Sequence, residues 1–413
     1  MTGQFPTCRF CKTPMTQTFV DLGETPLAND YVSADRFATP DLRYPLHARV
    51  CDACKLVQVD AVTTPQAIFG HYAYFSSYSA SWIEHARRFC EMARTRFGLD
   101  EGSQVVEVAS NDGYLLKHFV AAGVPALGIE PAANVAEAAI AAGVPTEVRF
   151  FGADTAVDLV SRGLAADLVI GNNVLAHVPD INDFVAGLAQ ILKPDGVVSV
   201  EFPHLANLIK QVQFDTIYHE HYCYLSLLAV ERIFHAHGLK VFDVEKLATH
   251  GGSLRVLACR VSSSKHQEQA GLGKVRTEEA SMGLDSVDAY KGFEPKVQAA
   301  RTSLLAFLRK AKQDGQTVTA YGAAAKGNTL LNYCGVGTDL VDYVVDRNPH
   351  KQGHWLPGSR VPIHAPERVF KMRPNFILIL PWNLETEIMS EMSAVREWGC
   401  RFVIAIPTTR IVS

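Results

Sequence analysis

The amino-acid sequence predicts an α/β protein whose main part is a doubly wound, parallel sheet. From Trp82 onward, amphipathic helical runs alternate with short apolar strands, which is the pattern of repeated β and α units. A small turn-rich segment with paired cysteines precedes this region, and a second α/β layer follows the polar residues 262–285. Because 413 residues are too many for one ordinary core, we expect two or three domains.

The first of these, residues 1–69, is expected to be a small zinc-binding domain. It carries two Cys-x-x-Cys pairs, Cys8 with Cys11 and Cys51 with Cys54. Two such pairs can place four thiolates at the corners of a tetrahedron, which is the closed coordination of structural zinc. The metal would then supply folding energy that a weak core cannot. Two unrelated pairs of buried cysteines are the alternative, since a redox Cys-x-x-Cys would need a thioredoxin-like context.

Composition and charge argue against nucleic-acid and membrane partners. A net charge of -4 and a pI ≈ 6.4 give no basic footprint, although a zinc ribbon that binds nucleic acid stays open as an alternative. The N-terminal "MTGQFPTCRFCK" lacks the pattern of a leader, and no apolar stretch is long enough to span a bilayer. We therefore expect a cytoplasmic protein, in which the nine cysteines do not form a disulfide framework.

Residues 70–261 are expected to form the central α/β domain. Its strands are expected at "QVVEVA", "PALGIE", "ADLVIGNN", "GVVSVEFP" and "SLRVLACRV". The first strand ends at Glu107, and the loop with Ser110, Asn111 and Gly113 leads into a helix. Ligands of such sheets lie at the carboxyl ends of the strands. The single glycine, Gly113, permits close backbone approach but provides no pyrophosphate cradle, which disfavours a dinucleotide.

The next two strands carry polar side chains at the same edge of the sheet. Glu130 follows "LGI", where a carboxylate can accept both ribose hydroxyls of an adenosine. The third strand ends at Asn172 and Asn173, with His177 close behind. Each motif by itself also fits a solvated loop, but three strand ends in this order make a coincidence less probable.

The segment "FDTIYHEHYCYLS" concentrates proton-handling side chains between Tyr218 and Tyr224. A metal cluster, an acid/base site and satisfied polar core residues are three interpretations of it. In a regular strand, Tyr218, Glu220 and Tyr222 would share one face, and His219 and His221 the other. Histidines and a carboxylate at adjacent positions do not form the helical H-E-x-x-H face, which disfavours the metal.

Residues 286–413 are expected to form the last domain. A helix at residues 293–313 leads to "TVTAYGAAAKGN", and "VDYVVDRN", "NFILIL" and "RFVIAIP" supply further strands. The small residues before Lys326 and Asn328 would let the backbone approach an anion, or would only pack a helix tightly on the sheet. Asp346 ends a strand where it could meet a ribose or base. The residues alone leave an NAD site open, with an incomplete fingerprint.

The segments 107–113 and 172–180, with Glu130, resemble the S-adenosylmethionine motifs of a class I methyltransferase. The whole chain is similar to the sugar C-methyltransferases of deoxysugar biosynthesis, which join an N-terminal zinc domain, a methyltransferase domain and a C-terminal Rossmann-like domain. This resemblance covers nearly all 413 residues and rests on the four cysteines, "YFSSYS", "SNDGYLL", "YHEHYCYLS" and "YGAAAKGNTLLNYCG". It implies S-adenosylmethionine as cofactor and a structural zinc. The implied cofactor-binding residues are Glu107, Ser110, Asn111, Gly113, Glu130, Asn172, Asn173 and Tyr78.

The resemblance also implies the substrate and the chemistry. Family members methylate the carbon next to a ketone, typically C-3', on a nucleotide-linked 4-keto deoxysugar, which here is expected to be a dTDP-sugar. A carbon acid needs a base and donors for the enolate oxygen, and histidine suits both duties. His221 is the expected base, with Glu220 to orient it, Tyr218 beside it, and His177 as a second candidate for either duty.

Further residues are expected around the substrate. Tyr72 would cover the cofactor or donate to the substrate, and Tyr78 is its rival for that place. Tyr222 would line the sugar pocket with Tyr218, and Lys326 with Asn328 would contact the diphosphate. An O- or N-methyltransferase, or a zinc-ribbon binding protein with a vestigial enzyme domain, are the rival functions. The oligomeric state is left open, a monomer included.

Overall fold

The computed structural model describes residues 5–62, 64, 76–78 and 80–412. Three β-sheets organise this part of the chain, a small one near the N-terminus, a seven-stranded one and a six-stranded one. Among the described helices, none combines the length and the apolar composition needed to cross a membrane.

The first sheet is antiparallel and has the strand order β1-β2-β3-β9. Its strands are β1 Gln17–Thr25, β2 Tyr44–Val50, β3 Val57–Val59 and β9 Cys223–Tyr224. β9 comes from the middle of the chain and pairs with β3 through Tyr224 opposite Val57. The sheet of the N-terminal region is thus completed by residues that lie far beyond it in the sequence.

The seven-stranded sheet has the order β10-β11-β8-β7-β4-β5-β6. Its strands are β4 Val105–Val108, β5 Ala126–Ile129, β6 Thr146–Glu147, β7 Ala166–Asn172, β8 Leu192–Pro203, β10 Leu239–Leu247 and β11 Ser253–Arg260. β8, β7, β4, β5 and β6 run parallel, as expected.

The expected parallel direction is wrong for the strand "SLRVLACRV". β11 runs antiparallel to both β8 and β10. Only residues 248–252 separate β10 from β11. A parallel pair needs a crossover of a dozen or more residues, so this short connection can only join antiparallel strands.

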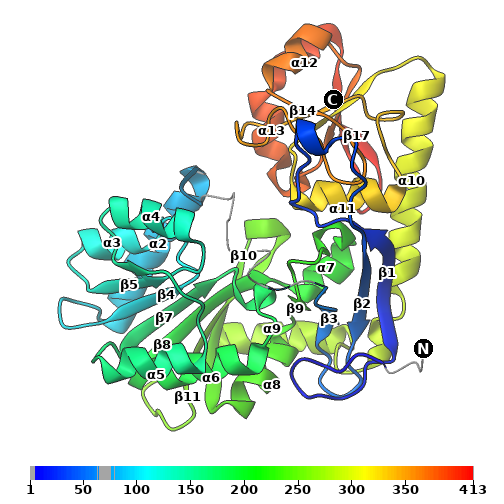
Figure 1. The fold of residues 1–413 in the computed structure, drawn as a ribbon. Coiled ribbons are helices and arrows are strands. Elements are labelled where there is room, and N and C mark those ends of the chain that lie inside the picture. The colour runs from blue at the N-terminus through cyan, green and yellow to red at the C-terminus, as the bar shows by residue number, and fades with distance from the viewer. Residues whose placement is uncertain (1–4, 63, 65–75, 79, 413) are drawn as a thin grey trace.

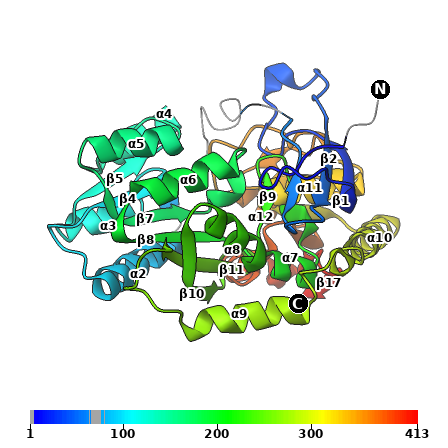
Figure 2. The same cartoon turned by 90° about the horizontal axis from the view of Figure 1, so that it is seen from below.

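Helices cover both faces of this sheet (Figures 1 and 2). They are α2 Ala80–Phe97, α3 Leu116–Ala121, α4 Ala133–Ala141, α5 Ala153–Ser161, α6 Ile181–Ile191, α8 Leu227–Ala236 and α9 Ala270–Ser281. α7 Leu205–Gln211 packs in the core of the first sheet instead. Val105 and Leu168 pack with Phe89 of α2 and Phe119 of α3. Their neighbours Val106 and Val169 point to the other face and join the core formed with α5, α6 and α8. This alternation is that of strands buried on both sides.

The third sheet has the order β14-β13-β12-β15-β16-β17, and all its pairs are parallel except β16 with β17. Its strands are β12 Val318–Tyr321, β13 Val344–Val345, β14 Ile363–His364, β15 Phe376–Ile379, β16 Arg401–Ile404 and β17 Arg410–Val412. The helices of this part are α10 Phe293–Gln313, α11 Ala325–Cys334, α12 Glu367–Met372 and α13 Glu385–Glu391.

One apolar core joins the first sheet to the last part of the chain. α10 lies beside β1 in Figure 1, and the rings of Phe19 and Phe293 stack with centroids 4.4 Å apart. Leu205 and Phe214 from the central region and Leu330 of α11 belong to the same core. Several short 3-10 helices carry the polar residues of the site: η2 Ser76–Tyr78, η3 Leu175–His177, η4 Phe214–Thr216, η5 Thr249–Gly251 and η7 Trp382–Leu384.

Candidate functional site

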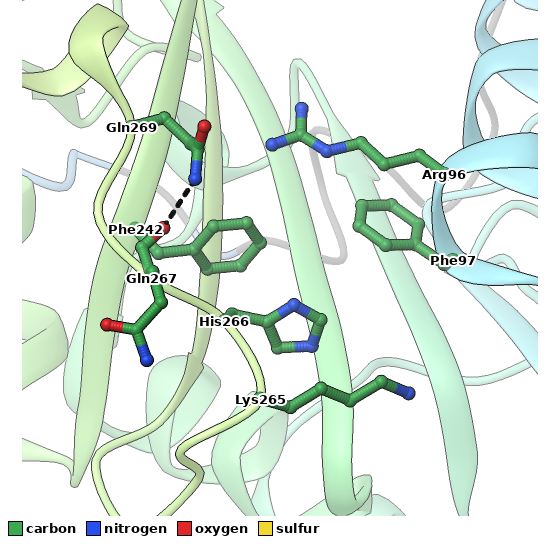
Figure 3. Close-up of a pocket in the computed structure, with 7 residues that line it drawn as sticks. All are labelled: Arg96, Phe97, Phe242, Lys265, His266, Gln267 and Gln269. Carbon is green, nitrogen blue, oxygen red and sulfur yellow. Dashed lines mark hydrogen bonds between the residues drawn. The ribbon is translucent and has the colours of Figure 1, made fainter.

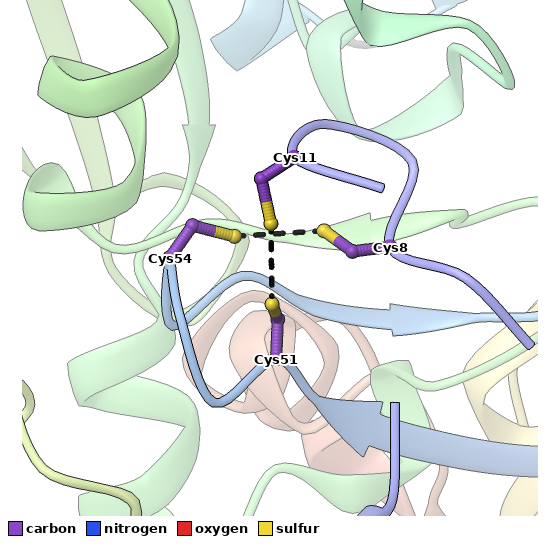
Figure 4. Close-up of side chains that lie close together, drawn as sticks. All are labelled: Cys8, Cys11, Cys51 and Cys54. Atoms are coloured by element: carbon purple, nitrogen blue, oxygen red, sulfur yellow. Dashed lines mark hydrogen bonds between the residues drawn. The ribbon is translucent and has the colours of Figure 1, made fainter. Parts of the chain in front are cut away.

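The four cysteines of the N-terminal region converge on one point (Figure 4). The sulfur atoms of Cys8 and Cys54 are 3.5 Å apart, those of Cys11 and Cys51 are 3.4 Å apart, and all four lie within 4.8 Å of one another. A tetrahedron with Zn–S bonds of about 2.3 Å has sulfur atoms about 3.8 Å apart. The four thiols therefore have the spacing of a closed zinc site, which confirms the expected ligand set.

Arg9, between the first two cysteines, connects this metal centre to the central domain. Its guanidinium donates to the carbonyl oxygens of Pro179 at 3.0 Å and Val59 at 2.7 Å. The same group lies 4.8 Å from the centre of the Tyr222 ring. The turn between Cys8 and Cys11 thus contacts Pro179, which follows β7, and Tyr222 of the "YHEHY" segment.

Buried polar atoms without a hydrogen-bond partner among the described residues gather at the carboxyl end of β4. Oε2 of Glu107, Oγ of Ser110 and Oδ1 of Asp112 are three of them. A Cβ on Gly128 of the neighbouring strand would lie 2.3 Å from Oγ of Ser110, so only glycine leaves room for this serine. Buried polar atoms are normally bonded, and these unpaired ones indicate a place where a polar ligand binds.

Glu130 follows β5 and is buried beside this loop. Its carboxylate accepts the backbone N–H of Asn111 at 3.0 Å and that of Ala132 at 2.8 Å. Burial raises the pKa of Glu130, and these two N–H groups oppose the rise. Asn111 has a φ of 52°, a left-handed conformation that the bond to Glu130 helps to hold. Each oxygen retains a lone pair for a ligand.

Gly113 permits a packing contact that its sequence position did not suggest. Its φ is +75°, and a Cβ there would lie 2.9 Å from Cγ2 of Val144 and 3.3 Å from Ala139. The close approach that glycine permits is therefore to α4 and the residues that follow it. The approach of the Gly113 backbone to a ligand stays a prediction.

The loop after β7 brings its polar residues to the same edge. Asn173 has a φ of 55°, donates its N–H to the carbonyl of Glu201 at 2.7 Å, and leaves its buried Oδ1 without a partner among the described residues. Asn172 is 9% exposed and ends the strand. Glu107, Ser110, Asn111, Glu130, Asn172 and Asn173 thus follow adjacent strands of one sheet.

The described residues of the "YFSSYS" segment, 76–78, contact the loop after β4. The backbone N–H of Ser76 donates to Oδ1 of Asn111 at 2.9 Å, and that of Ser77 to Oδ2 of Asp112 at 3.0 Å. Tyr78 ends the short helix η2, next to these contacts in the chain. Tyr72 lies outside the described residues.

The "YHEHY" segment forms a turn, because the N–H of His221 donates to the carbonyl of Tyr218 at 2.9 Å. Nδ1 of His221 lies 2.9 Å from the carbonyl oxygen of Thr216, and Nε2 lies 2.9 Å from the Tyr218 hydroxyl. Burial lowers the pKa of His221 well below its ordinary value, so the ring is neutral at pH 7. A neutral imidazole next to a phenol is suited to proton transfer.

Glu220 does not pair with His221. Its carboxylate accepts from Nδ2 of Asn29 at 2.7 and 2.9 Å, and burial raises its pKa to about 7. The turn places the backbone carbonyl of Glu220 2.8 Å from Nδ1 of His177. The expectation that Glu220 orients His221 directly is therefore wrong, because Asn29 occupies its carboxylate, and its carbonyl orients His177 instead.

His177 faces His221, with ring centroids 4.6 Å apart and planes at 69°. Since a carbonyl can only accept, Nδ1 of His177 carries a hydrogen, and the pKa of the ring is lowered to about 4 by burial. The structure thus brings His177, His221 and Tyr218 together, as the sequence predicted.

The neighbouring aromatic positions are more deeply buried. Tyr222 is 1% exposed and lies beneath Arg9. His219 is also 1% exposed, and its Nε2 lies 3.2 Å from the carbonyl of Pro45. His219 thus contacts the first sheet, and Tyr222 contacts Arg9 next to the metal centre.

In the last domain, the loop before α11 is held by its own neighbours. Asp346 accepts the N–H groups of Ala323 at 2.7 Å and Asn348 at 2.8 Å. Asn328 is 1% exposed, and its Oδ1 lies 3.2 Å from Nδ2 of Asn332. Lys326 is held within the same domain, where its Nζ donates to Oδ1 of Asn383 in η7 at 2.7 Å.

Sequence reasoning missed a charged group at the end of β8. Glu201 is buried and bonds His85 at 2.9 Å and Nη2 of Arg255 at 2.6 Å. Although burial alone would raise it, the bond from His85 and the charge of Arg255 lower the pKa of Glu201. Trp82 stacks on His85 with centroids 4.9 Å apart. Glu201 ends "VVSVE" just as Glu107 ends "VVE", and this shared pattern was the available signal.

Asn29, Asp215 and His250 were also missed. Nε2 of His250 lies 3.3 Å from Nδ2 of Asn173, and burial lowers the pKa of His250 to about 4. Asp215 is fully buried, with a pKa raised to about 6 by burial. Asn29 lies in a turn and His250 in the short helix η5, and no sequence motif surrounds either of them, so nothing local marked them.

A surface hollow of ≈ 230 Å³ lies away from these residues (Figure 3). Phe242 and His266 stack there with centroids 4.7 Å apart, next to Arg96 and Phe97. Arg96 is paired with Asp243 at 2.6 Å. None of the predicted site residues lines this hollow.

Three family models match consecutive parts of the chain. A zinc binding domain matches residues 8–69, a methyltransferase domain matches residues 82–244, and a C-methyltransferase C-terminal domain matches residues 248–407. The first range contains the four cysteines, and the second contains the carboxyl ends of β4, β5 and β7.

Individual proteins are similar over different lengths. C-methyltransferase NovU from Streptomyces niveus is 37% identical over 406 residues, which cover 98% of this chain and 96% of NovU. A ubiquinone biosynthesis O-methyltransferase from Mesorhizobium japonicum is 28% identical over 113 residues, 25% of this chain and 45% of that protein. Among solved structures, magnesium protoporphyrin IX methyltransferase from Synechocystis aligns with 43% of this chain and 79% of its own, at 14% identity and a TM-score of 0.34.

Proposed function

The chain belongs to the family of S-adenosylmethionine-dependent C-methyltransferases that includes NovU, and we propose that it methylates a nucleotide-linked keto sugar. The proposed reaction places the methyl group on the carbon next to the ketone, C-3' of a dTDP-linked 4-keto deoxysugar. The observation that carries the proposal is the pair of neutral histidines, His177 and His221, that face each other beside Tyr218.

The residues at the carboxyl ends of β4, β5 and β7 fit the cofactor. Glu107, Ser110 and Asn173 offer buried polar atoms without partners among the described residues, and Glu130 keeps lone pairs for ribose hydroxyls. When bound, S-adenosylmethionine supplies a methyl group already activated by its sulfonium. The protein therefore has to make a carbon nucleophile and hold it in line, because placement supplies most of the remaining rate effect.

We assign the making of this nucleophile to His221. The hydrogen on the carbon next to the ketone leaves as a proton to the imidazole, its bonding pair forms the enolate double bond, and the carbonyl pair moves to oxygen. A base must be neutral to accept this proton, and the lowered pKa of His221 keeps it so. The Tyr218 hydroxyl contacts Nε2 of His221. In this scheme Tyr218 either moves aside so that Nε2 can contact the substrate, or passes the carbon-bound proton on to Nε2.

His177, whose ring faces that of His221, would contact the same substrate. Its Nδ1–H is fixed by the Glu220 carbonyl, which leaves Nε2 as the acceptor nitrogen of the neutral ring. Tyr78 stays a proposed neighbour of the cofactor, since Ser76, two residues before it, bonds Asn111. Tyr72 stays a proposed neighbour on the resemblance alone.

The test is incubation of the full-length, zinc-loaded protein with a panel of nucleotide-linked keto sugars and S-adenosylmethionine, followed by mass analysis. In deuterated water, transfer to carbon requires loss of a carbon-bound proton, whereas transfer to oxygen or nitrogen leaves it in place. A product methylated on carbon supports the proposal. A product methylated on oxygen or nitrogen, or failure of every keto sugar in the panel while cofactor binds, would reject it.

A further inference from the structure

Lys326 belongs to α11, the helix of the last domain that contacts the central one through Thr329 and Ile217. Its ammonium donates to Oδ1 of Asn383 at 2.7 Å and lies 4.5 Å from the centre of the Trp382 ring. Trp382 in turn donates its indole N–H to Oδ2 of Asp215 at 2.8 Å. Both direct neighbours of the lysine thus lie in η7, and Trp382 links it to Asp215 of the central part. The lysine keeps some exposure to solvent.

The lysine is held where a charge is costly. Burial lowers its pKa, and the charge of Asp215 opposes the fall. Asp215 is 0% exposed, and its Oδ1 has no hydrogen-bond partner among the described residues. Two buried opposite charges of this kind are weak evidence for a stabilising role, because desolvation offsets the attraction between them.

The same short helix that supplies Asp215 also anchors the histidine pair. Asp215 and Thr216 both belong to η4, and the Thr216 carbonyl accepts from Nδ1 of His221 at 2.9 Å. The next carbonyl, of Ile217, accepts the Thr329 hydroxyl of α11 at 3.1 Å. α11 is therefore fixed directly against the segment that orients His221.

A second path leads from Lys326 to the β7 loop. The Trp382 ring packs on Gly251, where a Cβ would lie 2.4 Å from the ring. The preceding residue, His250, lies 3.3 Å from the Asn173 amide. Burial lowers the pKa of both His250 and His221, and the charge of Lys326 lowers each of them further.

We propose that Lys326 is a catalytic residue, whose ammonium donates a hydrogen bond to the ketone oxygen and holds its negative charge as the enolate forms. This inference rests on the proposed function. His221 takes the carbon-bound proton, the electron pair moves to the oxygen beside Lys326, and the enolate carbon then forms a bond to the methyl group as the carbon–sulfur bond breaks. The lysine remains protonated throughout, and Asp215 with the Trp382 ring keeps it so and in place.

This assignment differs from a contact to the diphosphate. If Lys326 bound the diphosphate, it would stabilise the bound substrate and the transition state equally. Loss of the lysine would then raise KM. A donor to the enolate oxygen acts mainly when charge develops, and its loss lowers kcat. The two roles therefore separate in the kinetics of one variant.

The experiment compares Lys326→Met with wild type on the keto sugar that wild type methylates. Exchange of the carbon-bound hydrogen for deuterium is followed with S-adenosylhomocysteine present, and kcat, KM and cofactor affinity are measured with S-adenosylmethionine. We expect exchange and kcat to fall about 100- to 1,000-fold, with KM and cofactor affinity nearly unchanged. Lys326→Arg keeps the charge, so its exchange rate and kcat should be at least about tenfold higher than those of Lys326→Met.

Two further variants keep the result interpretable. Lys312→Met removes an exposed lysine of α10 that bonds the Asp339 carbonyl, and it should behave as wild type. Lys326→Met leaves Asp215 buried without its counter-charge, so Lys326→Met with Asp215→Asn restores a folded protein that should still be slow.

The outcomes separate the two hypotheses. Wild-type exchange and kcat in Lys326→Met, or a rise in KM alone, overturn the role of Lys326 and leave the proposed function standing. A wild type that neither exchanges nor methylates any keto sugar overturns both.

Discussion

The Nε2 atom of His221 lies 2.9 Å from the hydroxyl oxygen of Tyr218. On the other side of the ring, Nδ1 faces the Thr216 carbonyl, which can only accept, so Nδ1 carries the hydrogen of the neutral ring. Nε2 therefore accepts from Tyr218, and the tautomer needed for a base at Nε2 is fixed by the backbone. The predictions on this residue follow from that arrangement.

His221→Ala should abolish most methyl transfer and leave the fold and cofactor affinity nearly intact. Loss of a general base costs about 100- to 10,000-fold in rate. His177→Ala should cost less if it only polarises the ketone. Turnover of both variants and calorimetric binding of S-adenosylmethionine are the measurements. Wild-type turnover by His221→Ala would make the pair structural, and a larger defect in His177→Ala, with proton exchange lost, would give the base role to His177.

The pH dependence of kcat/KM should reflect the lowered pKa of the buried base, His221. A base acts when deprotonated, that is, above its pKa, and burial lowers the pKa of His221 well below its ordinary value. The acid limb of kcat/KM should therefore lie below about pH 6.5, the ordinary value for histidine. Profiles between pH 5 and pH 8 test this. A limb centred at or above pH 6.5 would rule out neutral His221 as the base in the free enzyme.

Glu220→Gln should stabilise the fold increasingly as pH rises. The pKa of Glu220 is raised by burial from 4.5 to about 7, so between these values the folded state binds more protons than the unfolded state. Stability then falls as pH rises through this window, by up to about 3 kcal/mol. Glutamine removes the loss and can still accept from Asn29. Urea unfolding at pH 5 and pH 8 should give a variant advantage that grows with pH, and an advantage independent of pH would contradict the shifted titration.

Glu130→Ala should weaken S-adenosylmethionine binding by about 1.5–3 kcal/mol, because charge-assisted bonds are lost. The carboxylate also holds the N–H groups of Asn111 and Ala132, so the loop contributes to the loss. Glu137→Ala, on the exposed side of α4, is the matched control. Calorimetry that gives Glu130→Ala the wild-type dissociation constant would remove this residue from the site.

Gly128→Ala should destabilise the central domain and weaken cofactor binding. The added Cβ would lie 2.3 Å from Oγ of Ser110 and 2.9 Å from its Cβ, so the serine or the strand must move. Overpacking of this kind costs about 1–3 kcal/mol. Gly273→Ala in α9, where nothing lies within 4 Å, is the control and should be neutral or stabilising. Equal unfolding midpoints for the two variants would contradict the expected clash.

Freshly purified protein should contain about one equivalent of zinc, bound by the four cysteines. Cys54→Ser should lose the metal and lower the unfolding temperature, because the knuckles have little else to fold around. Cys400→Ser, in a different core, should keep the metal. Metal analysis that finds less than about half an equivalent in wild type would count against the zinc centre.

Sequence patterns predicted the parts of the fold and site that depend on local spacing. Strand ends such as Glu107 and Glu130 were predictable because parallel strands bring their carboxyl ends to one edge. The partner of Glu220 was not, because Asn29 lies 191 residues away and no periodicity links the two. The antiparallel β11 was missed because an apolar run does not encode its direction, which here depends on the short connection before it.

The last domain shows the same limit. A lysine after a small-residue loop predicts a phosphate contact from sequence alone, because the spacing resembles known anion loops. The direction of Lys326 depends on Asn383 and Trp382, which lie more than 50 residues away in the sequence, and on Asp215 of the central domain. Only the tertiary structure brings these groups together.

The strand β9 limits how such a protein can be rearranged by recombination. Residues 1–62 alone carry all four cysteines but lack Cys223–Tyr224, the strand that completes their sheet. A gene fragment that transfers only the N-terminal segment therefore transfers an open edge at β3, and its recipient must supply a matching strand. Exchange between relatives would succeed when both pieces travel together, so the two segments form one heritable unit although more than 150 residues separate them.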